Sequence, residues 1–318
     1  MLATRDRMRI LVTGGAGFIG SNYVHYLLEN SDDEVVTLDA LTYAGSRDNL
    51  AGVIDHPRHE FVEGNVCDSD LVAGLVADAD AVVNFAAESH VDRSIEGAAP
   101  FVETNVEGTR TLLDAAVETD LDRFLQISTD EVYGQILDGT FSEDDPLNPR
   151  NPYAATKASA DLLAKSYETT HNLPVLITRT CNNFGPRQHT EKLIPKFLRN
   201  AAAGENLPVY GDGSNVREWI YVADNCRALD LVLREGEVGE IYNIGSGEER
   251  TNLEVTEAIL EAVGGSEDQI TFVEDRAGHD QRYALETGKI EQLGWEPDWS
   301  FEEGLEQTAE MHIKNKNE

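Results

Sequence analysis

The segment STDEVYG, from Ser128 to Gly134, places a hydroxyl and two carboxyl groups side by side directly after the apolar run RFLQI. A reaction that removes one proton and donates another needs two groups in different protonation states. Neighbouring carboxyl groups in a closed, poorly hydrated site resist ionising together, so Asp130 and Glu131 would titrate in two separate steps. Acid pairs also occur elsewhere in the chain, for example at Asp32-Asp33. The pair therefore indicates chemistry only if its surroundings form a site.

A tyrosine and a lysine follow in the segment NPYAATKASADLLAKSYE. Tyr153 and Lys157 are four positions apart and so share one face of a predicted helix. A free phenol has a pKa near 10, and an ammonium group held beside it favours the phenolate. A shift of about 3 units corresponds to about 4 kcal/mol and would make the tyrosine a base near neutral pH. The same spacing is common on surface helices, so this pair also depends on its context.

A glycine-rich turn near the N-terminus supplies that context. RILVTGGAGFIGSN sets a predicted strand, a glycine turn and a helix in succession, which is the setting of a dinucleotide-binding fingerprint. Gly14 allows the tight turn, Gly17 lets the backbone approach a pyrophosphate, and Gly20 allows close packing of helix on strand. Asp39 ends the next predicted strand, where a carboxylate can bind the adenosine ribose hydroxyls and repel a 2'-phosphate. The motif predicts NAD, while Arg47 nearby leaves NADP open.

Alternating elements predict the fold. Short β-branched runs such as EVVTLD, AVVNFAA and PVLITRT alternate with amphipathic segments at Gly20 to Glu29 and Asn105 to Glu118. This pattern predicts an α/β protein with a doubly wound parallel sheet of Rossmann type, whose carboxyl edge would carry the acid pair. Past Asn182 the elements shorten, so we predict a Rossmann domain over 8–182 and a smaller C-terminal α/β domain over 183–318. Whether segments return to the first domain stays open.

Composition limits the possible partners and location. The 59 acidic and 25 basic residues give a net charge of -34, which would repel nucleic acid and anionic membranes. No apolar run is long enough to span a membrane, and the N-terminus lacks the apolar stretch of a signal peptide, so we expect a cytoplasmic protein. A dense, Lys-poor acidic surface indicates a halophilic protein. The three widely spaced cysteines predict neither disulfides nor a metal site.

Several motifs together carry a resemblance. TGGAGFIG, STDEVYG and YAATK resemble the extended short-chain dehydrogenase/reductase family. DALTYAGS, AAESHVDRSI, CNNFGPRQHTEKLIP, REWIYVADN and DRAGHDQRYA are similar to the dTDP-glucose 4,6-dehydratases within it, from about Arg9 to Trp299. The resemblance implies an NAD-dependent lyase of deoxysugar biosynthesis, whose C-terminal domain mainly binds a nucleotide sugar.

The resemblance also implies a mechanism for the conversion of dTDP-glucose to dTDP-4-keto-6-deoxyglucose. Thr129 would bind the sugar 4-oxygen, Tyr153 would deprotonate it, and Lys157 would lower the tyrosine pKa while NAD takes the C4 hydride. Glu131 would then remove the C5 proton as Asp130 protonates the C6 hydroxyl, which leaves as water. The hydride would then return to C6 and a proton to C5, so NAD is regenerated and stays bound.

Further site residues follow from the same resemblance. Those implied to bind NAD are Gly14, Gly17, Phe18, Ile19, Gly20, Asp39, Leu41, Thr42, Asn65, Val66, Ala86, Ala87, Ser89, Thr104, Tyr153, Lys157 and Asn183. Those implied to bind the nucleotide sugar are Ser89, Thr129, Asn182, Lys192, Leu193, Tyr210, Arg217, Asn252, Arg276 and His279. The two arginines suit a diphosphate, because a guanidinium can bind it in a bidentate manner. The chain departs from the family at Asn65, commonly aspartate, and at Ala277, usually proline.

Alternatives remain at this stage. The same chemistry could act on UDP-glucose, and a nucleotide-sugar 4-epimerase would need Thr129, Tyr153 and Lys157 but not the acid pair. A catalytically inactive NAD-sensing or scaffold protein would keep the glycines and lose the reactive groups, which are all present here. Family resemblance also implies a homodimer formed by paired helices, at Asn105 to Glu118 and Tyr153 to His171.

Overall fold

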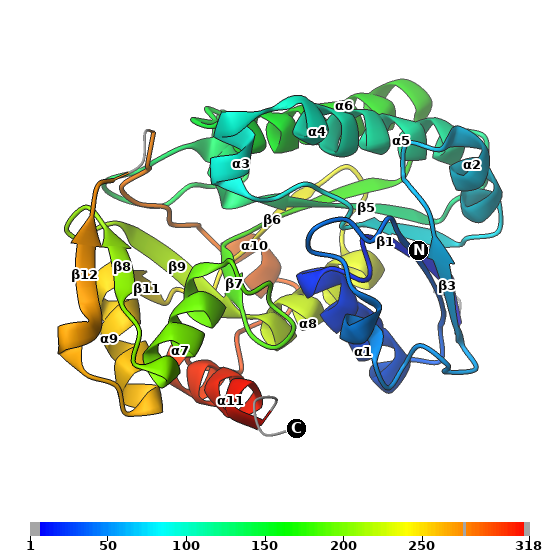
Figure 1. Ribbon diagram of the computed structural model, residues 1–318. Helices are drawn as coiled ribbons and strands as arrows, with labels where there is room; N and C mark the ends of the chain where they lie inside the picture. The colour runs from blue at the N-terminus through cyan, green and yellow to red at the C-terminus, as the bar shows by residue number, and fades with distance from the viewer. Residues whose placement is uncertain (1–6, 276–277, 315–318) are drawn as a thin grey trace.

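The computed structural model describes residues 7–275 and 278–314, with side chains as far as Met311 (Figure 1). The described strands are β1 (Arg9–Thr13), β2 (Glu34–Asp39), β3 (His59–Glu63), β4 (Ala81–Asn84), β5 (Arg123–Thr129), β6 (Val175–Thr180), β7 (Asn182–Phe184), β8 (Leu207–Tyr210), β9 (Val216–Tyr221), β10 (Ile241–Ile244), β11 (Glu249–Thr251) and β12 (Ile270–Val273). The α-helices are α1 (Phe18–Asn30), α2 (Ser69–Ala77), α3 (Val91–Glu96), α4 (Ala99–Phe101), α5 (Thr109–Val117), α6 (Pro152–His171), α7 (Leu193–Ala203), α8 (Val222–Glu235), α9 (Asn252–Val263), α10 (Gly288–Glu291) and α11 (Phe301–Lys314). The short 3₁₀ or π segments are η1 (Arg47–Leu50), η2 (Val102–Gly108), η3 (Asp130–Tyr133) and η4 (Glu267–Gln269).

Seven parallel strands form the main sheet in the order β10-β6-β5-β4-β1-β2-β3. Successive residues of each inner strand point to opposite faces, and both faces are covered by helices. Ile10 and Val12 therefore pack into one core, whereas Leu11 between them packs into another. This confirms the predicted α/β fold with a Rossmann-type parallel sheet, and explains why its inner strands are apolar without interruption.

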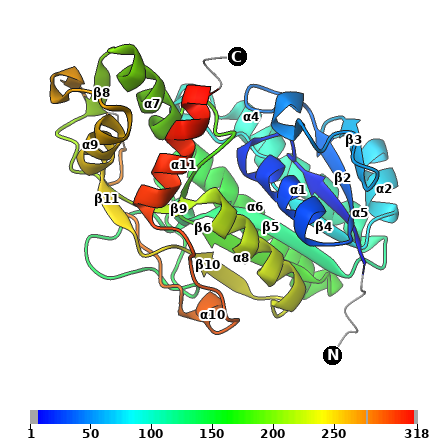
Figure 2. The ribbon, with the colours of Figure 1, turned by 90° about the horizontal axis from the view of Figure 1, so that it is seen from below.

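Helices cover the two faces of this sheet. α1 and α8 pack together on one face, while α2, α5 and α6 cover the other (Figures 1 and 2). Leu27 of α1 and Leu229 of α8 share a core with Ile10, and Leu112 of α5 shares the opposite core with Leu11. The two cores hold the carboxyl ends of the strands, where the acid pair lies, in a fixed arrangement.

The later part of the chain builds a second layer beside the sheet. A three-stranded sheet, β11-β9-β7, and the pair β12-β8 pack with α7, α9 and α11 around a third core (Figure 1). Strand β10 follows β7, β8 and β9 in the sequence. It nevertheless pairs in parallel with β6 and so belongs to the main sheet. The domain boundary after residue 182 stays a prediction. No helix in the described part of the chain is long and apolar enough to cross a membrane.

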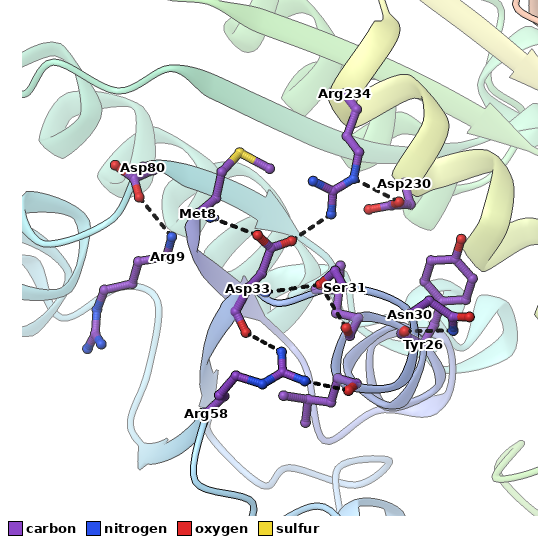
Figure 3. A network of polar contacts seen from close by, with 12 residues as sticks. Met8, Arg9, Tyr26, Asn30, Ser31, Asp33, Arg58, Asp80, Asp230 and Arg234 are labelled. Atoms are coloured by element: carbon purple, nitrogen blue, oxygen red, sulfur yellow. Dashed lines mark hydrogen bonds and ion pairs between the residues drawn. The ribbon is translucent and has the colours of Figure 1, made fainter. Parts of the chain in front are cut away.

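A buried carboxylate joins segments that are distant in the sequence. Asp33 accepts hydrogen bonds from the backbone N–H of Met8 at 2.7 Å and from Arg234 Nη2 at 2.6 Å (Figure 3). Arg58 donates to the carbonyl of Asp33 at 2.8 Å, and Arg234 also donates to Asp230 at 2.9 Å. These bonds fix the start of β1 and the loop before β2 to α8, and so hold α8 in place below the sheet.

Two local expectations differ from the structure. The first helix begins at Phe18, two residues before the expected Gly20, because Gly17 is its N-cap. The expected helix from Asn105 to Glu118 is the end of a longer helical run, from Ala99 to Val117, that contains the π-helical segment η2. The π-helical turn brings Asn105 to Glu88, whose backbone N–H and carbonyl both bond to the Asn105 amide, at 2.8 and 3.0 Å. All three cysteines are free, and Cys67 is only partly buried.

Candidate active site

A cavity of about 950 Å³ lies at the carboxyl edge of the main sheet and extends to the second layer. The ends of β1, β2, β4, β5 and β6 contribute to its wall, and β8, β9 and α7 contribute from the other side. Ligands of open α/β sheets bind at this edge, because neighbouring loops that lead to helices on opposite faces of the sheet leave a crevice between them. The cavity is therefore the candidate ligand-binding site of the sheet.

The glycine turn between β1 and α1 forms one end of the cavity. Gly14 has a φ of +67°, and a Cβ there would lie 2.7 Å from the backbone nitrogen of Ala86. A Cβ at Gly20 would lie 2.3 Å from the carbonyl oxygen of Gly14, a distance that real Cβ atoms do not reach. Only glycine fits both positions, so the turn can bring its backbone and the N-terminus of α1 close to a bound pyrophosphate.

Asp39 lies beside this turn at the end of β2. It is 8% exposed, and its two carboxylate oxygens accept hydrogen bonds from the backbone N–H groups of Ala16 at 2.9 Å and Leu41 at 2.8 Å. Burial raises the pKa of Asp39, and these two bonds act against that rise. Arg47, which left NADP open in the sequence, pairs with Glu63 at 3.0 Å and does not line the cavity.

The two acids differ in their surroundings. Asp130 is buried, and its Oδ1 accepts a hydrogen bond of 3.1 Å from Thr129 Oγ1, while its Oδ2 has no hydrogen-bond partner among the described residues. Burial, followed by the charges of Glu131 and Glu218, raises the pKa of Asp130 well above its usual value. Glu131 is partly buried and accepts a hydrogen bond of 3.0 Å from Asn151 Nδ2. This arrangement favours a protonated Asp130 near neutral pH.

Tyr153 lies next to the acid pair. Burial raises the pKa of its phenol well above the usual value, and the charges of Glu131 and Asp130 add to the rise, whereas a hydrogen bond with Thr129 acts in the opposite direction. A buried phenolate beside two carboxyl groups is disfavoured. The effect that the sequence predicts for Lys157, together with the positive nicotinamide ring, stays a prediction.

Lys157 is buried and bonded elsewhere. Its Nζ donates a hydrogen bond of 2.6 Å to the carbonyl of Ile127, and burial lowers its pKa to about 8 against the opposing charge of Asp161. Asp161 is itself paired with the buried Arg179, whose Nε donates to it at 3.0 Å. Lys157 lies on α6, four residues after Tyr153, and its ammonium group is thus anchored to β5.

The comparisons with known proteins agree with this site. The model of the GDP-mannose 4,6 dehydratase family matches residues 11–308. The chain belongs to this nucleotide-sugar 4,6-dehydratase family. It is 76% identical to the low-salt glycan biosynthesis protein Agl12 of Haloferax volcanii, over 96% of this chain and 99% of that protein. It is 51% identical to a dTDP-glucose 4,6-dehydratase of Streptomyces niveus, over 97% of this chain and 94% of the relative.

A solved member of the family has the same fold. The crystal structure of the dTDP-glucose 4,6-dehydratase DesIV from Streptomyces venezuelae, with NAD bound, has a TM-score of 0.95 to this chain and 52% sequence identity. The alignment covers 98% of both chains. The resemblance predicted from the motifs is therefore confirmed at the level of the family.

Nearly all predicted site residues of this family member share the cavity. Those that line it are Gly14, Gly17, Phe18, Ile19, Gly20, Asp39, Thr42, Asn65, Val66, Ala86, Ala87, Ser89, Thr104, Thr129, Asp130, Glu131, Tyr153, Lys157, Asn182, Asn183, Lys192, Leu193, Tyr210, Arg217, Asn252 and His279. Leu41 does not line the cavity: its side chain packs against the core that contains Ile10, while its N–H bonds to Asp39, and its contact with NAD stays a prediction. Arg276 lies outside the described residues.

Arg217 lines the cavity of this dehydratase family member. Its guanidinium lies 4.5 Å from the ring centroid of Tyr283 and donates to the carbonyl of Asp280 at 2.9 Å. Asp280 in turn accepts a hydrogen bond from the Tyr283 hydroxyl and pairs with Arg150 at 2.8 Å. Asp280 and Tyr283 thus orient the Arg217 guanidinium, and Arg150, from a distant part of the chain, bonds to Asp280.

Sequence reasoning missed several residues around the acid pair. Tyr283 lines the cavity and faces Glu131, whose charge helps to raise the tyrosine pKa, but a single tyrosine has no local signal. Asp161 follows Lys157 by four positions on α6, a spacing that could have indicated the contact. Asn151, just before the proline that begins α6, carries an N-cap signal that could have been found.

Proposed function

We propose that this protein is a NAD-dependent dTDP-glucose 4,6-dehydratase that produces dTDP-4-keto-6-deoxyglucose and water. The observation that carries the proposal is the acid pair: Asp130, whose surroundings favour the protonated form, lies beside Glu131, in one cavity with Thr129 and Tyr153. Elimination of water across C5 and C6 needs both an acid and a base on the same substrate. The similarity to named dTDP-glucose 4,6-dehydratases supports the proposal.

The residues present fit NAD. A Cβ at Gly14 would clash with the Ala86 backbone and one at Gly20 with the Gly14 carbonyl oxygen, so only glycine allows the tight turn that a pyrophosphate needs. Asp39 lies at the carboxyl end of β2, where it can bind the adenosine ribose. When bound, NAD supplies a hydride acceptor for C4, a hydride donor for C6 and a positively charged ring. Phe18, Ile19 and Thr42 line the same part of the cavity and would hold the cofactor.

The chain's own residues handle the protons. The Thr129 hydroxyl would bind the sugar 4-oxygen, and Tyr153, which lines the same cavity, would take its proton. Because burial and the two acids disfavour the phenolate, this step would need the positive charge of bound NAD. The 4-keto group then acidifies the C5 proton, which Glu131 removes. Asp130 donates its proton to the C6 hydroxyl, which leaves as water, and the buried setting of the pair keeps bulk water out.

The acid pair also separates this proposal from its alternatives. A 4-epimerase moves a hydride at C4 only and has no use for a protonated Asp130 beside Glu131. UDP-glucose would undergo the same chemistry, and the preference for dTDP-glucose is supported by the names of the similar dehydratases.

One assay tests the proposal directly. The purified protein, in molar KCl, is incubated with dTDP-glucose and separately with UDP-glucose; the products are separated by chromatography that resolves the C4 epimers and are identified by mass, and NADH is followed by absorbance. Loss of one water from dTDP-glucose, without accumulation of NADH, is the expected result. A galactose product would favour an epimerase, faster conversion of UDP-glucose would change the assigned substrate, and unchanged sugar in both tubes would refute the proposal.

We also infer a homodimer in the cytoplasm. The support for the dimer is the adjacent pair of helices α5 and α6, which lie side by side on one face, with Leu162 of α6 and Val102 of the preceding segment η2 exposed. Burying two such apolar side chains between subunits would remove them from water. Light scattering in molar KCl tests the dimer, and cell fractionation tests the location.

A further inference from the structure

Asn151 makes two side-chain hydrogen bonds to two parts of the active site. Its Oδ1 accepts from the backbone N–H of Ala154 at 2.8 Å, and its Nδ2 donates to Glu131 Oε2 at 3.0 Å. Both are within ordinary hydrogen-bond distances. The first bond belongs to the helix that carries Tyr153 and Lys157, and the second belongs to the acid pair.

The first bond is the N-cap of α6. Asn151 has the extended backbone of an N-cap residue, with φ -137° and ψ 163°, and Pro152 occupies the first helical position. Tyr153 and Lys157 are the second and sixth residues of this helix, so the cap fixes the first turn that presents the phenol. For capping alone, Ser or Asp would serve as well as Asn.

The second bond requires an amide. Glu131 lies beside Asp130 and faces the buried phenols of Tyr153 and Tyr283, whose pKa values its charge helps to raise. A donated hydrogen bond favours the charged form of a carboxylate in such surroundings. Of the good N-cap residues, Ser and Asp could accept from Ala154 N–H, but Asp has no donor when ionised and Ser has one short hydroxyl. Asn is the N-cap residue that can both accept and donate here.

We propose that Asn151 is a positioning residue that couples the C5 base to the tyrosine helix, a role that rests on the proposed dehydratase function. Through one side chain it orients the Glu131 carboxylate, and it fixes the turn of α6 that carries Tyr153. Proton removal from C5 therefore depends on a residue that need not touch the sugar.

Three substitutions separate the two bonds. Asn151→Ser keeps a cap acceptor and loses the amide donor, Asn151→Asp keeps the acceptor and places a negative charge beside Glu131, and Asn151→Ala loses both bonds. Ser300→Ala is the control for a lost cap remote from the site, because Ser300 Oγ accepts from Glu303 N–H at 3.3 Å at the start of α11. For each variant we measure the melting temperature, exchange of the C5 hydrogen with solvent in heavy water, and the NADH formed in a single turnover.

The proposal predicts a specific pattern. Asn151→Ser and Asn151→Asp should keep the melting temperature and C4 oxidation, but slow C5 exchange by about 10-fold or more, the scale of a hydrogen bond to a charged group. Asn151→Ala and Ser300→Ala should both melt about 2–4 °C lower, and only Asn151→Ala should also lose exchange.

Other results would overturn the proposal. If Asn151→Ser exchanges C5 like the wild type, or if C4 oxidation falls as much as exchange, Asn151 is only a helix cap. A wild-type protein that oxidises C4 without exchanging C5 would refute the proposed dehydratase function, and the coupling role with it. If the wild type exchanges C5 and the variants do not differ from it, only the coupling role fails.

Discussion

The ammonium group of Lys157 donates a hydrogen bond of 2.6 Å to the carbonyl of Ile127, which anchors it to β5 two residues before Thr129. Burial lowers the Lys157 pKa to about 8, while the charge of Asp161 opposes this shift. The lysine is therefore charged below about pH 8 and loses its charge above it. A reaction that needs the ammonium group should become slower as pH rises through this value.

We thus predict an alkaline limb near pH 8 in the rate of C4 oxidation, measured as NADH formed in a single turnover across pH 6 to about 10. Asp161→Asn removes the charge that opposes the shift, so the limb should move to lower pH. The same variant should be less stable, because Arg179 stays buried without its anion. A rate that is flat between pH 7 and about 9 in both proteins would contradict the assignment.

The same lysine affects stability in a predictable direction. Its folded-state pKa lies below the unfolded value of 10.5, so the cost of burying the ammonium is fully present below about pH 8. As pH rises from about 8 to 10.5, the folded state releases its proton first and this cost fades. Comparing urea unfolding of the wild type and Lys157→Met across this range should show a difference in free energy that shrinks with pH. A constant difference would mean that Lys157 titrates normally.

Substitutions of the two acids should affect different steps of the reaction. Glu131→Gln removes the base and should abolish exchange of the C5 hydrogen with solvent, which mass spectrometry in heavy water detects. Asp130→Asn keeps the shape of the protonated acid but has no proton to donate, so exchange should continue while loss of water slows by about 100-fold or more. Both variants should still oxidise C4. If both lose exchange equally, the division of roles between the acids is wrong.

Local patterns in the sequence predicted much of this site. The glycine turn, Asp39 and the acid pair all follow predicted strands, and their chemistry depends mainly on those strand ends. The resemblance then predicted distant residues such as Arg217, which the cavity brings to the same place. Contacts that depend on tertiary packing could not be predicted from the sequence. Leu41 packs against the core that contains Ile10, and nothing near Lys157 in the sequence shows that its ammonium bonds to the Ile127 carbonyl.

The glycine turn gives a steric prediction with a matched control. A Cβ in Gly20→Ala would lie 2.3 Å from the Gly14 carbonyl oxygen, and the turn cannot yield because Gly14 is itself confined by Ala86. We expect a loss of about 1–3 kcal/mol in unfolding free energy and loss of NAD during purification, measured by absorbance of the denatured protein's extract. Gly74→Ala in α2 meets nothing within 4 Å and should keep NAD, with about 0.5–1 kcal/mol greater stability. Retention of NAD by both variants would contradict this account of the turn.

The Asp33–Arg234 pair should matter more than exposed pairs. Asp33 is 2% exposed and Arg234 27% exposed, so Arg234→Met leaves a buried carboxylate without its cation. We expect the unfolding free energy to fall by about 2–3 kcal/mol, with little change when salt is added. Arg7→Met removes the exposed partner of Glu34 and should cost about 0.5 kcal/mol or less. Equal effects in urea titrations would show that burial does not decide the strength of these pairs.

The acidic surface leads to a prediction about salt. A net charge of -34 repels itself across the folded surface, and the screening length falls from about 10 Å at 0.1 M to about 3 Å at 1 M salt. The melting temperature should therefore rise steadily with KCl. Neutralising five exposed acids, by Asp32→Asn, Asp55→Asn, Glu257→Gln, Glu261→Gln and Glu306→Gln, should make that rise shallower and raise the melting temperature most at low salt. Sucrose adds no ions, so it should stabilise both proteins equally. A melting temperature that does not respond to KCl would refute adaptation to high salt, because the repulsion that screening removes would then be too weak to affect folding.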